Sequence, residues 1–195
     1  MCIIIANVSG MLSNQTLEES NRRNPDGAGL MFSINGQLFT YKDMDGQKII
    51  DIYRRQRKAH PDTPMFLHFR IGTSGNRNKL NCHPFKIGRR TALMHNGILP
   101  EYDYPRSRLN DTQHFIADVL DHIPVEHIFG EAVKGRIEEI IGERNKLVIL
   151  RHNGNWDIFN EELGHWDDDN WYSNYSYIPR PAGYTKKKHG WVLST

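Results

Sequence analysis

Hydrophobic and polar positions along the chain alternate in short blocks that predict strands. Residues 2–8 are apolar and β-branched on both alternating faces, which indicates a strand that is covered on both sides and central in its sheet. Residues 65–71 alternate strictly between two faces, and residues 91–95 form another apolar strand. Asn35-Gly36 and Asn153-Gly154 are strong turn signals. They predict hairpins with strands over residues 28–33, 37–42, 146–150 and 156–159.

Helical spacing of apolar residues predicts helices over residues 17–23, 46–58, 110–120 and 125–141. Asn110 can cap the third of these helices, and Gln113 can reach back to it. Basic residues end the second helix, where they complement its dipole and favour a solvated helix end over a nucleic-acid patch. Because strands come as hairpin pairs with helices between the groups, the pattern predicts an α+β layered sandwich of antiparallel sheets with helices outside.

The length fits a single domain, residues 1–195, with a sizeable core. From about residue 161 the chain is polar and aromatic and runs to Lys186-Lys187-Lys188, so residues 161–195 are expected to form a peripheral tail that packs on the domain. The formal net charge of +2 gives no reason to expect a nucleic-acid partner. The chain has two cysteines, and neither lies in a CxxC motif. We find no signal-peptide core and no apolar run long enough to cross a bilayer. These features predict a cytoplasmic protein with no membrane partner.

Ten histidines raise the question of a metal site, but no HxxxH or HExxH spacing occurs. His83 and His95 stand on different segments, and Asp167-Asp168-Asp169 lacks the alternating ligands of a calcium loop. We therefore expect neither a metal nor a cofactor. Cys82 is interpreted as a structural residue rather than a reactive one.

Cys2 would carry both a thiol and a free α-amine once Met1 is removed. A thiolate is a nucleophile, and an α-amine has a reference pKa of about 7.7–8.0, which suits a general base near neutral pH. The alternative role for Cys2 is that of a small, buried apolar residue. Which role Cys2 has, nucleophile or buried apolar residue, depends on the residues around it.

Other polar positions could complete a site around such a nucleophile. Arg70 shares a strand face with His68 and could bind a carboxylate through two hydrogen bonds, or simply pair with a surface acid. The Asn96 amide and the Gly97 N–H could hold an oxyanion, although Asn-Gly equally predicts a third hairpin. Asp111, in a first helical turn, could bind an ammonium group or complement the helix dipole.

Taken in order, these residues resemble the class II glutamine amidotransferases, which are N-terminal-nucleophile (Ntn) hydrolases. The family pattern opens with Met-Cys and an apolar strand, and its later motifs stand here in family order up to about Trp156. These motifs are Asp26-Gly27-Ala28-Gly29, His68 to Gly75 as His-x-Arg-x-x-Thr-x-Gly, His83-Pro84-Phe85, His95-Asn96-Gly97 and Asn110-Asp111-Thr112-Gln113. Further on, the segment Trp171-Tyr172-Ser173-Asn174 is similar to a Ser-Asn segment of some stand-alone members.

The resemblance implies a four-layer αββα fold with Cys2 at the start of a central strand. It also implies that Cys2 attacks the side-chain amide of glutamine or a related γ-glutamyl amide, and that Asn96 and Gly97 hold the oxyanion. Arg70 would bind the substrate carboxylate and Asp111 its ammonium group. A γ-glutamyl thioester would form, ammonia would leave, and water would release glutamate. Thr73 would join Arg70 in binding the substrate, as support for the carboxylate site. Supporting roles would fall to His68, Gly27, Gly72 and His95.

The sequence departs from the larger synthases of this family at Ile71 and Ser74, where those members often have Trp and His. We also expect no second catalytic domain, which makes the chain similar to the stand-alone members. Three functions stay open: an amidohydrolase acting alone on a small-molecule substrate, an ammonia-supplying subunit that depends on a separate synthetase, and a non-catalytic binding module if Met1 is retained.

Overall fold

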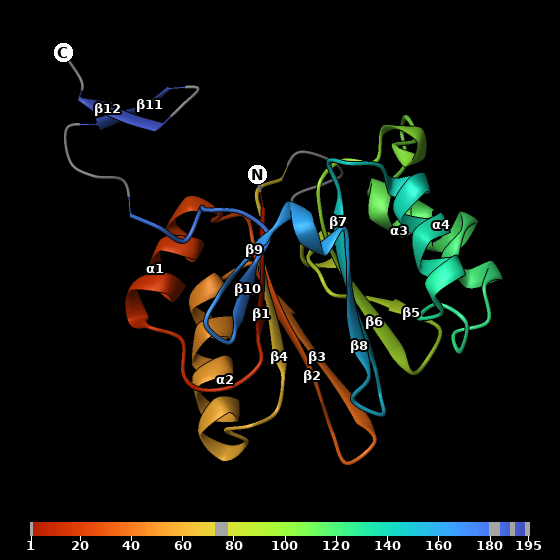
Figure 1. Ribbon diagram of the computed structural model, residues 1–195, viewed down its shortest axis with the longest axis horizontal. Coiled ribbons are helices and arrows are strands. Elements are labelled where there is room, and N and C mark those ends of the chain that lie inside the picture. The colour runs from red at the N-terminus through yellow and green to blue at the C-terminus, as the bar shows by residue number, and fades with distance from the viewer. Residues whose placement is uncertain (1, 73–77, 180–183, 188–189, 194–195) are drawn as a thin grey trace.

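The computed structural model describes residues 2–72, 78–179, 184–187 and 190–193. Its strands form a six-stranded sheet, a four-stranded sheet and a two-stranded hairpin. Helices α1 (Asn14–Arg23) and α2 (Gly46–Ala59) cover the outer face of the first sheet, and α3 (Asp111–Asp118) and α4 (Glu131–Ile141) cover the outer face of the second (Figure 1). The predicted α+β sandwich of two antiparallel sheets flanked by helices is confirmed, and its layers follow the order αββα.

The six-stranded sheet has the order β3-β2-β4-β1-β10-β9. Its strands are β1 (Ile3–Asn7), β2 (Ala28–Ile34), β3 (Gln37–Asp43), β4 (Met65–Phe69), β9 (His165–Asp167) and β10 (Asn170–Tyr172). β1 lies between β4 and β10, pairs antiparallel with both, and is buried at every position. The prediction of a central strand covered on both faces is therefore confirmed.

The four-stranded sheet has the order β5-β6-β7-β8. Its strands are β5 (Phe85–Ile87), β6 (Thr91–Asn96), β7 (Lys146–Arg151) and β8 (Trp156–Phe159). The hairpins predicted at Asn35-Gly36 and Asn153-Gly154 are both present, with each glycine at positive φ. Asn96-Gly97 forms no hairpin, because β6 pairs with β5 and β7 and the chain after it runs into the 3₁₀ turn Pro100–Tyr102.

Three apolar clusters hold the layers together. The first lies between α1, α2 and the larger sheet, the second lies between the smaller sheet and α3, α4, and the third lies between the two sheets. β1 sends Ile3 and Ile5 into the first cluster and Ile4 and Ala6 into the third. This division explains why its sequence is apolar at successive positions: each face of the strand lines a different core.

Two predicted helix starts are wrong by several residues. α1 begins at Asn14 rather than residue 17, because the Ser13 hydroxyl caps it by accepting a hydrogen bond from Thr16 N. α4 begins at Glu131 rather than residue 125, because residues 124–130 form turns that end in the cap residue Gly130. Ile128 in those turns is buried in the second cluster, so its apolar spacing reflects core packing without a helix.

The segment expected to pack peripherally contributes strands to the larger sheet. β9 and β10 extend the sheet beyond β1, and Trp171 on β10 is fully buried. Such three-residue strands are too short for an alternating pattern to reveal them. Beyond them, β11 (Tyr184–Lys187) and β12 (Gly190–Leu193) form the antiparallel hairpin.

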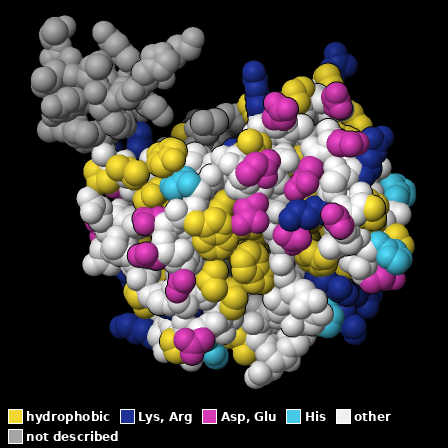
Figure 2. All heavy atoms as spheres, in the orientation of Figure 1, with side chains coloured by type: hydrophobic (Ala, Val, Ile, Leu, Met, Phe, Trp, Pro, Cys, Tyr) yellow, Lys and Arg dark blue, Asp and Glu magenta, His cyan; other side chains and the backbone are white. Residues whose placement is uncertain are grey.

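Both acidic and basic side chains occur on the face drawn in Figure 2, with acidic ones near its middle and most basic ones toward its rim. Within the ranges that the structure describes, no helix is long and apolar enough to cross a bilayer.

Replacing Asn110 with Ala should lower the free energy of unfolding by about 1 kcal/mol, the usual contribution of an N-cap. Asn110 Oδ1 accepts from Gln113 N at 3.0 Å, and Gln113 Oε1 accepts from Asn110 N at 3.2 Å, which is the predicted reciprocal cap of α3. Urea unfolding of the two proteins measures the change. Asn110→Ser, which keeps a cap acceptor, is the matched control; an equal loss in both variants would contradict the capping role.

Candidate functional site

Cys2 lies where one end of β1 meets the residues that follow β4. The two strands are antiparallel, with Ile3 opposite Phe69, so Cys2 stands beside the segment that begins at Arg70. Cys2 Sγ accepts a hydrogen bond from Ile71 N at 3.3 Å and donates one to Ile71 O at 3.4 Å. The thiol is thus held against the backbone of a single residue, Ile71, where β1 begins.

Burial raises the pKa of the Cys2 thiol, and the Ile71 hydrogen bond and the Arg70 charge offset this only in part. A thiol with a raised pKa is protonated at neutral pH. Any reaction through its thiolate therefore needs a nearby base.

A narrow pocket brings the predicted nucleophile together with four other predicted site residues. Cys2, Arg70, Gly97 and Asp111 all line it. Its other lining residues are Ile71, His83, His95, Asn110 and Thr112. Arg70 and Asp111 are only 4% and 5% exposed, so this pocket presents a buried cation and a buried anion beside the thiol. That combination suits a ligand carrying both charges.

The Asp26-Gly27 turn fixes the backbone around Arg70. Arg70 N donates to Gly27 O at 2.8 Å, and Asp26 N donates to Arg70 O at 2.9 Å. Gly72 N donates to Asp26 Oδ2 at 2.9 Å. A Cβ on Gly27 would lie 2.4 Å from Cys82 Sγ, so a side chain there would collide with a buried residue. The motif glycines thus shape the loops that position Arg70.

Asp111 is oriented by its own helix start. Its Oδ1 accepts from Thr112 N at 2.8 Å, and its Oδ2 accepts from Leu99 N at 2.8 Å. An ionised carboxylate has about four acceptor positions, so these bonds leave capacity for a ligand.

His95 is a buried, neutral histidine that ties the second sheet to two neighbouring segments. Its Nε2 lies 2.9 Å from Asn145 Oδ1, which can only accept, so Nε2 carries the proton. Its Nδ1 then accepts from Thr112 Oγ1 at 2.8 Å. Burial lowers the pKa of His95. His68 Nε2 reaches His95 O at 3.1 Å across the two sheets, and burial lowers the pKa of His68 to about 3.

Gly97 occupies a position that has no room for a side chain. A Cβ built there would lie 1.9 Å from Asn145 Oδ1 and 2.9 Å from His95 Nε2. Asn145 has little freedom to yield, since its Nδ2 donates to Ile141 O at 2.6 Å. The glycine lets the backbone pass close to this hydrogen-bond network.

Ser173 and Asn174, directly after β10, contact both Asn96 and Cys2. Asn96 Nδ2 and Ile4 N both donate to Ser173 Oγ, at 2.7 and 2.8 Å. Asn174 Nδ2 donates to Cys2 O at 2.6 Å. These contacts give the Ser-Asn segment a structural role that the sequence indicated only through its similarity to stand-alone family members.

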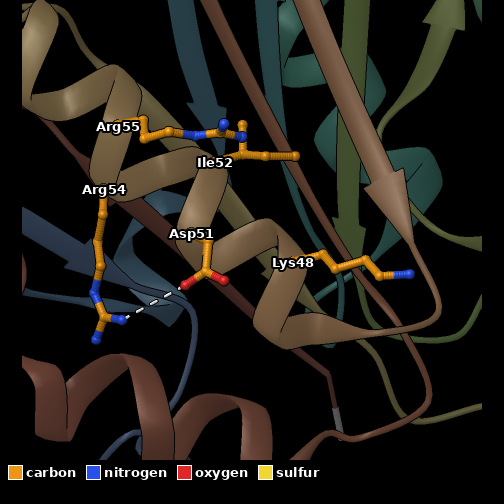
Figure 3. Close-up of a pocket in the computed structure, with 5 residues that line it drawn as sticks. All are labelled: Lys48, Asp51, Ile52, Arg54 and Arg55. Carbon is orange, nitrogen blue, oxygen red and sulfur yellow. Dashed lines mark ion pairs between the residues drawn. The ribbon is translucent and has the colours of Figure 1, made fainter.

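A larger cavity of about 840 Å³ shares Cys2 and Gly97 with the narrow pocket. Its remaining lining residues are Asn96, Ile98, Pro100, Ile141, Gly142, Glu143, Arg144 and Asn145. Thr73, which the sequence placed near the carboxylate site, lies outside the described residues. Figure 3 shows a separate hollow on α2, lined by Lys48, Asp51, Ile52, Arg54 and Arg55, which includes none of the predicted site residues. Within the described part of the chain, no cluster of three or more His, Cys, Asp or Glu could hold a metal ion.

The chain is similar in sequence to a protein named for a glutamine-dependent reaction. The chain is 26% identical over 171 residues to a protein named probable glutamine–fructose-6-phosphate aminotransferase (isomerizing) from Acanthamoeba polyphaga mimivirus; the match covers 85% of this chain and 26% of that protein. The chain therefore spans about a quarter of the relative's length. No family model matches the sequence.

Two solved structures are similar in fold. One is a glutamine aminotransferase class-II domain protein from Silicibacter pomeroyi, with 18% identity, a TM-score of 0.42 and coverage of 78% of this chain and 73% of that one. The other is glutamine phosphoribosylpyrophosphate amidotransferase from B. subtilis, with 13% identity, a TM-score of 0.49 and coverage of 88% and 41%. All three proteins carry glutamine aminotransferase or amidotransferase names. The sequence match to the mimivirus protein agrees with the family resemblance drawn from the motifs.

Acidification should destabilise the protein because its buried histidines are neutral when folded. Burial lowers the pKa of His68, His83 and His95, whereas the unfolded chain binds these protons below about pH 6.5. Stability is therefore full above that pH and falls as pH falls, by up to about 1.4 kcal/mol per pH unit for each histidine. Urea unfolding at pH 7, 6 and 5 measures the slope. His83→Phe removes one titrating group, so the slope of unfolding free energy against pH should fall by up to about 1.4 kcal/mol per pH unit. An unchanged slope would contradict this account.

Proposed function

We propose that this chain is a class II glutamine amidotransferase domain that hydrolyses the side-chain amide of glutamine or of a related γ-glutamyl amide, with Cys2 as the nucleophile. One observation carries the proposal: the Cys2 thiol lines the same narrow pocket as the buried guanidinium of Arg70 and the buried carboxylate of Asp111. Free glutamine is a zwitterion with an amide tail. A cation, an anion and a nucleophile in one pocket match those three groups.

The chemistry begins with a proton transfer. The Cys2 thiol has a raised pKa, so its proton must pass to a base before attack. The α-amine of Cys2 is that base in the proposed mechanism, directly or through water, which requires cleavage of the peptide bond between Met1 and Cys2. The thiolate then attacks the amide carbon. Asn96 Nδ2 still has a second N–H besides the one on Ser173, and this donor and Gly97 N–H hold the oxyanion.

Collapse of the tetrahedral adduct breaks the carbon–nitrogen bond. The departing nitrogen takes the proton from the α-amine and leaves as ammonia, and a γ-glutamyl thioester remains on Cys2. Water attacks the thioester, its proton returns to sulfur through the same base, and glutamate departs. Throughout, Arg70 binds the substrate carboxylate and Asp111 its ammonium group.

Substrate binding in this mechanism requires the narrow pocket to open. Its volume of about 20 Å³ holds no more than about one water molecule. The side chains that line the pocket must therefore move apart as glutamine enters. Such rearrangement is common in sites that close over a small ligand.

A second candidate function is supply of ammonia to a separate synthetase. The chain spans only 26% of the aminotransferase that it resembles, so acceptor chemistry would reside in another polypeptide or segment. This candidate predicts weak glutaminase activity of the purified chain and a marked increase when the synthetase is added.

A freed N-terminus tests the proposed mechanism directly. We expect a form in which a protease leaves Cys2 as the first residue to release ammonia from glutamine about 10²- to 10⁴-fold faster than a form with an uncleavable N-terminal extension, because only the first has a general base on Cys2. Intact mass confirms the first residue of each form. Equal rates in both forms would refute the role of the α-amine.

A further inference from the structure

The cavity beside Cys2 is far too large for the ammonia that glutamine releases. Its volume of about 840 Å³ lies within the usual range for sites that bind organic ligands, about 300–1,000 Å³. A single water in the liquid takes up only about 30 Å³, and ammonia is of similar size. The narrow pocket and this cavity meet at Cys2 and Gly97, so a substrate held by Arg70 and Asp111 can extend past the nucleophile into the cavity.

The cavity lining combines an apolar surface with a cation. Ile98, Pro100 and Ile141 supply the apolar part, and Ile98 is 51% exposed despite its position next to Gly97. Arg144 also lines the cavity, and within the described residues no hydrogen bond or ion pair holds its guanidinium. Glu143, next to Arg144 in the sequence, places an acidic side chain in the same lining. The set suits a ligand with an apolar body and a carboxylate.

We propose that this cavity is a leaving-group subsite and that the preferred substrate is a γ-glutamyl amide of an apolar amino acid, with its side chain against Ile98 and its carboxylate at Arg144. This inference rests on the proposed function and names its substrate class. The reaction is balanced as before: sulfur attacks the γ-carbonyl carbon, the carbon–nitrogen bond breaks, and the nitrogen takes a proton and leaves as the free amino acid. Water then converts the thioester into glutamate and the Cys2 thiol.

A matched set of substrates separates the two features of the subsite. The set is glutamine, γ-glutamyl-isopentylamide and γ-glutamyl-leucine; the second adds the apolar body, and the third adds only a carboxylate to the second. With Cys2 freed, we expect kcat/KM to rise at least about tenfold from the first to the second. It should rise about threefold more from the second to the third, as for an ion pair at an exposed rim.

Variants assign these gains to residues. Arg144→Gln should remove the preference for γ-glutamyl-leucine over the isopentylamide, whereas Glu143→Gln should increase it, because the change removes a like charge. Ile98→Trp, which adds bulk to the cavity lining, should lower the ratio of kcat/KM for either substituted amide to that for glutamine by about tenfold. Ile178→Trp changes a similarly exposed isoleucine that does not line the cavity and should leave the ratio as it is.

The outcomes distinguish failure of the subsite from failure of the proposed function. If glutamine is hydrolysed through Cys2 as well as the substituted amides, or if Ile98→Trp leaves the ratio unchanged, the subsite is refuted and the amidohydrolase stands. If no γ-glutamyl amide is hydrolysed and a glutamine-like electrophile does not label Cys2, both proposals fail.

Discussion

Replacing Cys2 with alanine should lower the rate of glutamine hydrolysis by at least about a thousandfold, because the reaction loses its nucleophile and the base alone cannot form the acyl intermediate. The fold should persist. Among the described residues the thiol makes two long hydrogen bonds, both to Ile71, so the free energy of unfolding should change by less than about 1 kcal/mol. Ammonia release measures the first effect and urea unfolding the second. Labelling with diazo-oxo-norleucine, read by the mass of the N-terminal peptide, reports the nucleophile itself.

Cys82 offers the matched control for this variant. It is the other cysteine, it is fully buried, and it does not line the narrow pocket. Cys82→Ala should keep both the hydrolysis and the label. Activity that survives in Cys2→Ala, or label that appears on Cys82, would overturn the assignment of the nucleophile.

Replacing Gly97 with alanine should impair both stability and activity. The new Cβ would lie 1.9 Å from Asn145 Oδ1, so Asn145 and its partner His95 must shift. Such overpacking costs about 1–3 kcal/mol of unfolding free energy. Displacement of the Gly97 N–H from the oxyanion should lower kcat by about 10²–10³-fold, the usual effect of losing one such donor. Urea unfolding and single-substrate kinetics measure the two effects.

Gly135 is the matched control for this glycine. It lies in α4, and a Cβ built there meets nothing within 4 Å. Gly135→Ala should leave kcat unchanged and stabilise the protein by up to about 1 kcal/mol, since alanine is the better helix former. Full activity in Gly97→Ala would show that this backbone segment is not part of the oxyanion site.

The sequence predicted those parts of the fold whose cause is local. The hairpins at Asn35-Gly36 and Asn153-Gly154 follow from backbone preferences of the turn residues themselves, and the capping box at Asn110 and Gln113 follows from spacing within a single turn. The central position of β1 was predictable because a strand that lines two cores must be apolar on both faces. Strands that form only by pairing with distant segments were not predicted. β9 and β10 have three residues each, which is too short for an alternating pattern to be recognised.

In the candidate site, too, some features follow from local sequence and others depend on distant segments. Motif order identified Cys2, Arg70, Gly97 and Asp111, and the structure brings these residues to one pocket, while their catalytic roles stay predictions. No local pattern distinguished Asn96-Gly97 from the two hairpin turns. What distinguishes it is the Asn145 side chain against Gly97, a contact between segments that the sequence gives no means to pair.

The large sequence separation between β1 and β10, which pair in the sheet, has a consequence for folding during synthesis. Ile4 N reaches Ser173 Oγ, 169 positions further along the chain, so the strand made first waits for β10, one of the last strands of the sheet, before its second edge is paired. Pairings of such high contact order form slowly. Until the ribosome has released residues 170–174, the Cys2 carbonyl lacks its bond from Asn174 and the Asn96 amide lacks its bond to Ser173. Until these residues are made, one edge of β1 should stay exposed to other strands.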